Sequence, residues 1–176
     1  MILETQRTRL EPWSRDDAAA FHAIASDSRV MQYITRGIPW TEAQTQEFIV
    51  RQMRFFSERG FCLWKLVLKS TGTISGFCGI QDLEGTNETE IGWWLAWEHW
   101  GKGIATEAAR RVLTDAFSRA KLRRIVAIAR PENAASRRVM EKIGMVYERD
   151  YVHRGIPIVL YAISPIQWAK IGKVNF

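Results

Sequence analysis

The segment from Glu88 to Ala129 constrains the fold more than any other part of the chain. Glu88–Ala96 reads as a strand, and a glycine-containing turn separates it from a helix that begins just after Gly103. Two adjacent i,i+4 rows of apolar side chains form one stripe on this helix, Ile104, Ala108, Val112 and Ala116 beside Ala105, Ala109, Leu113 and Phe117. Arg124–Ala129 reads as a second strand. A strand, a helix and a strand in this order predict two parallel strands joined by a helical crossover.

The other expected elements surround this unit. We expect extended backbone over Ile2–Trp13, helices over Asp16–Ala25, Arg29–Ile34 and Thr41–Arg59, strands over Phe61–Lys69 and Thr73–Asp82, a helix over Asn133–Ile143, and strands over Met145–His153 and Pro157–Ser164. Phe48, Phe56 and either Met53 or Gln52 form the expected apolar stripe of the third helix. Hairpins in the middle of the chain predict antiparallel pairing. The fold class is therefore α/β (α+β), a mixed, twisted sheet with helices on both faces. Because the sequence shows no repeat and no linker, we expect residues 1–176 to form a single domain.

The composition is that of an ordinary globular protein, with 47% hydrophobic and 25% charged residues. No window approaches the ~18 uninterrupted apolar residues of a membrane span, and the first residues lack the pattern of a signal peptide. We therefore expect a cytoplasmic protein without a membrane partner. Cys62 and Cys78 lie in predicted apolar strands and form no spaced framework, and no metal site is expected.

The chain is basic, with a formal net charge of +6. Such a balance is typical of proteins that bind nucleic acid, a membrane surface or an anionic cofactor. A basic nucleic-acid-binding module, the alternative from another class, requires basic residues gathered on one face beside aromatic stacking platforms. Here the arginines and lysines are scattered, and the longest runs are pairs. The distribution argues against nucleic acid.

The turn from Trp100 to Ala105 lies between a predicted strand and a predicted helix. Gly101 and Gly103 allow tight backbone turns and the close approach of a ligand. The amides of Gly101–Ala105 lie at a helix start, where the helix dipole favours an anion, so the turn can bind a phosphate or pyrophosphate. It matches neither the dinucleotide fingerprint nor the P-loop. A plain strand-to-helix turn is the alternative interpretation.

Two motifs in this chain resemble those of the GNAT acetyltransferases. Trp100–Ala105 is similar to the pyrophosphate-binding motif of that superfamily, Gln/Arg-x-x-Gly-x-Gly/Ala, and Glu132–Met145 is similar to its second motif, Asn-x-x-Ser/Ala followed by a helix and Gly-Phe. Thr8–Trp13, together with Asp16 and Asp17, resembles the RimJ/RimL ribosomal-protein-alanine N-acetyltransferase branch, in which tryptophan at the place of Trp100 is typical. The resemblance covers essentially the whole chain.

The resemblance implies a sheet of about seven strands whose fourth and fifth strands splay apart, with acetyl-CoA as co-substrate in the opening. It implies that the backbone of Trp93, Trp94 and Leu95 pairs with the pantetheine arm. It assigns the pyrophosphate to the turn, Trp100, Gly101, Lys102, Gly103, Ile104 and Ala105. It also places Asn133 beside the arm or the thioester, and Ser136 near the sulfur.

Glu90 is the expected general base. It opens the strand that carries the cofactor contacts and shares a face with Gly92 and Trp94 by the two-residue alternation of strands. GNAT enzymes often place a catalytic glutamate early on this strand, acting directly or through water. A carboxylate with a purely structural role is the alternative interpretation, and Glu88 and His99 are the alternative bases.

The general acid is harder to assign from the sequence. Many GNAT enzymes carry a tyrosine in the helix of the second motif, and here Met140 occupies that place. Ser136 or a water molecule is the expected substitute. A thiol with a pKa of about 8.5 leaves readily as a thiolate, so the reaction does not require a strong acid. A GNAT fold that binds acyl-CoA as a sensor, without turnover, is the alternative that Met140 raises.

The acceptor amine is expected between the early helices and the last hairpin, with Tyr33, Trp40 and Phe55 as walls. These segments carry aromatic residues and no acidic cluster, and the positive chain repels polycations. We therefore expect a protein or peptide N-terminal α-amine as the acceptor. A small amine, such as an amino acid, an antibiotic or a polyamine, is the alternative. No feature of the sequence specifies an oligomeric state.

Overall fold

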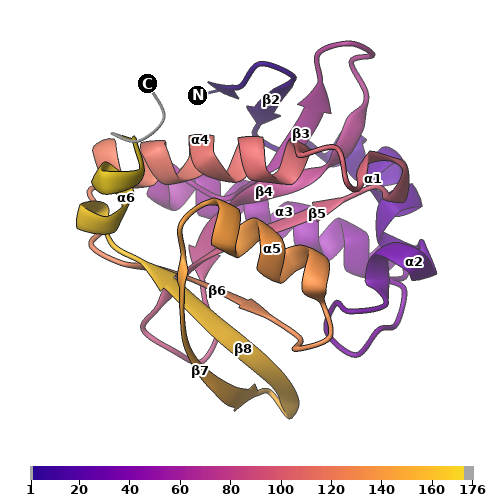
Figure 1. Ribbon diagram of the computed structural model, residues 1–176. Coiled ribbons are helices and arrows are strands. Elements are labelled where there is room, and N and C mark those ends of the chain that lie inside the picture. The colour runs from indigo at the N-terminus through magenta and orange to yellow at the C-terminus, as the bar shows by residue number, and fades with distance from the viewer. Residues whose placement is uncertain (1, 173–176) are drawn as a thin grey trace.

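An open sheet of eight strands forms the centre of the computed structural model, which describes residues 2–172 (Figure 1). The strand order is β1-β2-β3-β4-β5-β6-β8-β7. The strands are β1 Leu3–Glu4, β2 Thr8–Glu11, β3 Leu63–Leu68, β4 Ile74–Asp82, β5 Thr89–Leu95, β6 Ile125–Ala129, β7 Val146–His153 and β8 Ile156–Ile163. All neighbouring pairs are antiparallel except β5 and β6, which are parallel. The predicted mixed α/β fold is confirmed.

The eighth strand arises from a hairpin at the start of the chain. The sequence predicts one extended segment over Ile2–Trp13, and the structure divides it into β1 and β2, with Leu3 opposite Leu10. The Thr5 amide donates to the Thr8 carbonyl at 2.9 Å, and the Thr8 amide donates to the Thr5 hydroxyl at 2.9 Å. The expected single strand is therefore wrong, because threonine side chains complete a turn that no glycine or proline marks.

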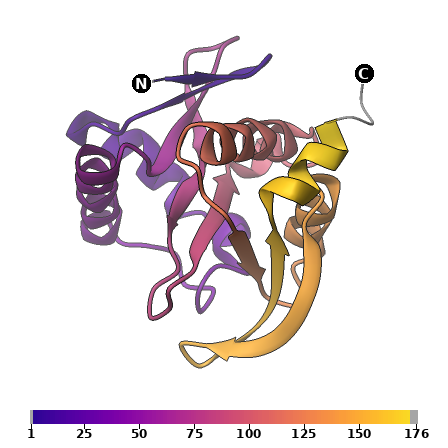
Figure 2. The ribbon, with the colours of Figure 1, turned by 90° about the vertical axis from the view of Figure 1, so that its left-hand side faces the viewer.

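The helices lie on opposite faces of the sheet (Figure 2). One face carries α1 (Ala18–Ala25), α2 (Ser28–Met31) and α3 (Glu42–Arg59), and the other carries α4 (Ile104–Ser118), α5 (Ala134–Lys142) and α6 (Pro165–Gly172). Short 3-10 turns occur at Arg15–Asp17 and Trp97–His99. The sequence does not predict α6. No helix in the described part of the chain is both long and apolar enough to cross a membrane.

Each face of the sheet has its own apolar core. Trp64, Leu113 and Ile125 are fully buried on the α4 face, and Trp13, Phe21 and Phe48 are buried against α1 and α3. Burying such a side chain stabilises the fold by about 1.5–3 kcal/mol. The buried stripe of α3 comprises Thr45, Phe48, Ile49 and Gln52, which confirms Phe48 and the alternative Gln52, whereas Phe56 is only partly buried. Gln52 rather than Met53 faces inward, where its amide group has polar partners.

The pairing between β5 and β6 is limited to one position, Glu90 opposite Val126. By contrast, β5 pairs with β4 along its whole length, from Thr89 to Leu95. Beyond Glu90, the edge of β5 that faces β6 is therefore free of strand pairing. This is the predicted splay, between the fourth and fifth of the seven strands expected from the sequence.

Candidate active site

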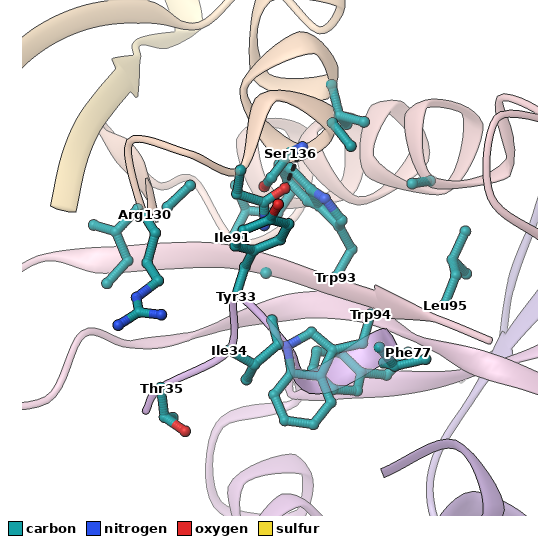
Figure 3. A pocket seen from close by; sticks show the side chains of 18 of the residues that line it. Tyr33, Ile34, Thr35, Phe77, Ile91, Trp93, Trp94, Leu95, Arg130 and Ser136 are labelled. Atoms are coloured by element: carbon teal, nitrogen blue, oxygen red, sulfur yellow. Dashed lines mark hydrogen bonds between the residues drawn. The ribbon is translucent and has the colours of Figure 1, made fainter. Parts of the chain in front are cut away.

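A cavity of about 890 Å³ opens at this splay. Its walls come from β5, the starts of α4 and α5, the α2–α3 loop and α3 (Figure 3). Most residues singled out from the sequence line it, namely Tyr33, Trp40, Glu90, Trp93, Trp94, Leu95, Trp100, Gly101, Gly103, Ile104, Ala105, Asn133 and Ser136. The fold thus gathers residues from distant parts of the chain around one space.

The glycine turn presents backbone to this cavity. Gly101 and Gly103 have φ values of 72° and 75°, in the left-handed region that favours glycine. Gly103 is the N-cap residue of α4, so free amides of the first helical turn lie at the cavity. A Cβ atom at Gly101 would meet no atom within 4 Å. The turn is therefore open to an anion. The Lys102 side chain is exposed and stands apart from the cavity lining.

Trp100 ties this turn to the end of β5. Its indole N–H donates to the Leu95 carbonyl at 2.8 Å, and its ring lies 4.8 Å from that of Trp97. The tryptophan at the first position of the motif thus orders the chain between β5 and α4.

Arg7 holds the same turn from the opposite end of the chain, a contact that sequence reasoning missed. Its guanidinium donates to the Lys102 carbonyl at 2.6 Å and to Glu107 at 2.6 Å, and its backbone amide donates to Glu107 at 2.9 Å. Because Glu107 lies in the first turn of α4, Arg7 joins the N-terminal hairpin to the helix start. No local pattern around Arg7 marks this role.

The start of α5 faces the turn across the cavity. Asn133 is the N-cap residue, and its side-chain oxygen accepts the Ser136 amide at 3.0 Å. The Asn133 NH₂ group and the Ser136 hydroxyl have no hydrogen-bond partner within residues 2–172, so both can serve a ligand. Met140, at the place of the family tyrosine, is buried in the core and also lines the cavity. No phenol from α5 reaches this space.

Glu90 is half-buried in the cavity wall. Burial raises its pKa to about 7, although a hydrogen bond from Gln81 opposes the rise. The Gln81 amide nitrogen donates to the Glu90 carboxylate at 2.8 Å. A carboxyl group with this pKa is about half ionised at neutral pH, which suits a general base.

Gln81 is held in turn by Gln52, a fully buried residue of α3. The Gln52 amide nitrogen donates to the Gln81 side-chain oxygen at 3.2 Å, and the Gln52 oxygen accepts the Leu63 amide at 2.9 Å. This chain of donors fixes the orientation of both amides and directs an N–H group at Glu90. The sequence signals were faint: a polar residue in an apolar helix stripe, and a glutamine opposite Glu90 in the β4–β5 register.

The two alternative bases have different surroundings. Glu88 is ion-paired with Arg124 at 3.1 Å and lies outside the cavity lining. The same guanidinium binds Glu148 at 2.6 Å. His99 lines the cavity, with its side chain 19% exposed and 4.0 Å from Glu98. The ion pair holds Glu88 outside the cavity, which leaves Glu90 and His99 as the candidate bases in its lining.

An aromatic wall covers the α3 side of the cavity. The Trp94 ring lies 4.7 Å from Trp40 and 4.9 Å from Phe77, and Trp40 lies 5.4 Å from Phe48. Figure 3 shows Trp94 and Phe77 on one side of β5 and Trp93 on the other side, toward Ser136. Between Glu90 and Trp94 on the same strand face, Gly92 carries no side chain, so space is left beside the carboxylate.

Phe55, expected in the acceptor wall, lies elsewhere. Phe55 packs against the apolar core on the α4 face of the sheet. The guanidinium groups of Arg54 and Arg59 lie 5.8 and 5.7 Å from its ring centre. Phe55 is seven residues beyond Phe48, so it lies about 10 Å further along α3. That distance carries it past the end of the cavity.

The two cysteines offer no nucleophile. Cys62 and Cys78 are fully buried and form no disulfide. Burial raises the pKa of both thiols far above their usual range, so neither forms a thiolate near neutral pH. A covalent acyl-cysteine route therefore has no support in this site.

Comparison with known proteins identifies the family to which this chain is similar. Residues 7–146 match the family model described as an acetyltransferase (GNAT) domain. The Bacillus subtilis protein YkkB is 38% identical over 162 residues, which cover 90% of this chain and 93% of YkkB. A solved GNAT-family acetyltransferase from Bacillus anthracis has a TM-score of 0.79 and 32% identity, with 93% and 98% of the two chains covered.

RimL, a ribosomal L7/L12 alpha-N-protein acetyltransferase solved in complex with coenzyme A, has the same fold. Its TM-score is 0.79 at 18% identity, with 93% of this chain and 98% of RimL covered. The family model alone spans most of the chain, and it agrees with the splayed sheet and the glycine turn. This chain therefore belongs to the GNAT acetyltransferase family and is an acyltransferase that uses acetyl-CoA.

Proposed function

We propose that this protein transfers the acetyl group of acetyl-CoA directly to a primary amine, with Glu90 as the general base. The observation that carries the proposal is a carboxyl group with a pKa of about 7 in the wall of the cavity that the glycine turn enters. The transfer forms one N–C bond and breaks one S–C bond. The amine proton passes to Glu90, directly or through water, and CoA leaves as a thiolate or thiol.

The cofactor-binding residues we propose are those on the other side of the splay. The amides of Gly101, Gly103, Ile104 and Ala105 receive the pyrophosphate, with Trp100 and the Lys102 backbone ordering the turn. The free edge of Trp93, Trp94 and Leu95 pairs with the pantetheine arm, and Asn133 lines that arm. Acetyl-CoA supplies an activated thioester. Ser136, or a water molecule, protonates or stabilises the departing sulfur in place of the tyrosine that Met140 replaces.

For the acceptor, we propose the α-amine of a protein or peptide N-terminus. The α-amine has a pKa of about 7.7–8.0, so roughly a tenth is neutral at pH 7, whereas a lysine amine at about 10.4 is almost wholly charged. A base with a pKa of about 7 is sufficient for the first and poor for the second. The aromatic wall with Tyr33 and Trp40 suits one uncharged amine. RimL is named for this reaction, which supports the choice.

A small amine, such as an amino acid, an antibiotic or a polyamine, is the second candidate acceptor. The test is a competition in which spermidine and an alanine- or serine-starting peptide are offered at equal concentration. We expect kcat/KM to favour the peptide. A tenfold preference for spermidine, about 1.4 kcal/mol of transition-state discrimination, would contradict the proposed acceptor class.

A further inference from the structure

The acceptor side of the cavity carries more positive than negative charge. Its lining includes Arg36 in the α2–α3 loop, Arg51 in α3, Arg130 after β6, and Arg154 in the β7–β8 turn. The lining carboxylates among the described residues are Glu84 and Glu90. Glu84 forms an ion pair with Arg154, so these two charges cancel each other. Glu90 is partly neutral, because burial raises its pKa to about 7.

The other three arginines have no carboxylate partner in the described chain. Arg36, Arg51 and Arg130 take part in none of the ion pairs within 4.0 Å that residues 2–172 form. Figure 3 shows the Arg130 side chain extending toward the side of the pocket where Thr35, the neighbour of Arg36, lies. Three cations thus border one cavity without an ion-pair partner among residues 2–172.

Arg51 is placed by the aromatic wall. Its guanidinium lies 5.8 Å from the centre of the Phe48 ring, and Phe48 packs against Trp40 and Phe77. A guanidinium over an aromatic face keeps its in-plane N–H groups free, and these match the oxygens of a carboxylate or phosphate. The neighbouring Arg54 and Arg59 lie outside the cavity lining and are engaged by Glu58 and Asp82.

We propose that the acceptor carries an oxyanion in addition to its amine, and that Arg51 and Arg36 bind this group, with Arg130 adding positive charge. This inference rests on the proposed function, because the amine must lie at Glu90. The phosphates of the cofactor have their own site at the glycine turn. The acceptor is therefore a molecule with both an amine and a carboxylate or phosphate, such as a free amino acid, or a peptide with an acidic residue near its N-terminus.

Matched acceptors test this inference. One pair is Ala-Glu and Ala-Gln peptides, which have similar α-amines. A second pair is phenylalanine and its amide, and a third is an Ala-Ser peptide with and without a phosphate on the serine. Each pair is assayed with the wild type, Arg51→Gln, Arg36→Gln and the control Arg54→Gln, an exposed position of the same helix. The ratio of kcat/KM within a pair, compared between enzymes, cancels any difference in amine pKa.

We expect the wild type to prefer the anionic member of at least one pair by tenfold or more. The preferred pair identifies a peptide carboxylate, a free amino acid or a phosphate. Arg51→Gln and Arg36→Gln should reduce that preference to threefold or less, whereas Arg54→Gln should leave it unchanged, with CoA affinity the same in all four proteins. Equal turnover within every pair would overturn the inference, as would a preference that survives both substitutions or a loss confined to CoA affinity. CoA binding without acetylation of any acceptor would instead contradict the proposed function.

Discussion

Glu90 has a pKa set by two opposing effects. Burial in the cavity wall disfavours the carboxylate and raises the pKa, while the Gln81 hydrogen bond favours the carboxylate and lowers it. The balance is a pKa of about 7. The buried chain from Leu63 through Gln52 to Gln81 keeps the donor in place, so the two glutamines position the base.

Removing the donor should therefore raise the pKa of Glu90. We expect Gln81→Leu to shift the acidic limb of kcat/KM to higher pH by about 0.5–1 unit, since one pKa unit corresponds to about 1.4 kcal/mol and a hydrogen bond contributes about that much. The measurement is a pH–rate profile beside Gln46→Leu, an exposed position of α3. If the acidic limb of the kcat/KM profile lies at the same pH in Gln81→Leu as in the wild type, the pKa of Glu90 does not determine that limb.

Glu90 also makes the stability of the fold depend on pH. Its pKa is raised in the folded state, so the unfolded chain loses this proton first as the pH rises, and folding is weakened between the unfolded value near 4.5 and about 7. We expect Glu90→Gln to raise the melting temperature at pH 8.5 and to have almost no effect at pH 4. Thermal melts across this range give the comparison. An increase in melting temperature that is the same at pH 4 and at pH 8.5 would contradict the raised pKa of Glu90.

Among the elements, the junction of β5 and α4 depends on contacts that are distant in sequence. Trp100 fixes the turn from within, and Arg7 fixes it from the N-terminal hairpin. Arg7 holds a backbone carbonyl and the first turn of α4 together, so its removal should loosen the amides that bind the pyrophosphate.

We expect Arg7→Ala to weaken CoA binding by about 3–10-fold, equivalent to about 0.7–1.4 kcal/mol. Arg9→Ala is the matched control, because Arg9 pairs with Glu11 of its own strand and does not contact the turn. Calorimetric titration of the folded variants with CoA gives the two affinities. Equal affinity in Arg7→Ala and wild type would show that the turn holds its shape without Arg7.

The helices whose ends and apolar faces are marked by their own residues were predicted well from the sequence. The capping box at Thr41 and the left-handed Gly60 set the ends of α3, and the apolar rows of α4 all face the core. The first hairpin was missed because its turn is made by threonine hydroxyls, and α6 was not expected at all. Local patterns mark helix ends and apolar faces well, and they mark unusual turns poorly.

At the scale of the whole molecule, the cavity lies at the splay between β5 and β6 and is lined by residues from helices on both faces of the sheet. The proposed cofactor motifs lie in two continuous segments with recognisable spacing, so the sequence alone could single them out, and most of their residues line the cavity. The proposed acceptor side is built from side chains of α3, β4, β5 and three loops, which only the tertiary fold brings together. Gln81 and Arg51 were therefore not predicted, and Gln52 was expected only as an alternative member of the α3 stripe, with no role in the site. Phe55 was placed wrongly, because the pattern of a helix face does not show how far along the helix a cavity extends.

The central claim is that Glu90 removes the proton from the acceptor amine. The most direct test is kcat/KM as a function of pH for wild type and Glu90→Gln, with CoA affinity measured in both. We predict that Glu90→Gln lowers turnover by about 10²-fold or more near pH 7, that the loss shrinks as the pH rises and the amine deprotonates unaided, and that CoA affinity changes little. A loss that is the same at every pH, or no loss at all, would contradict the claim and assign the proton transfer to His99 or to water.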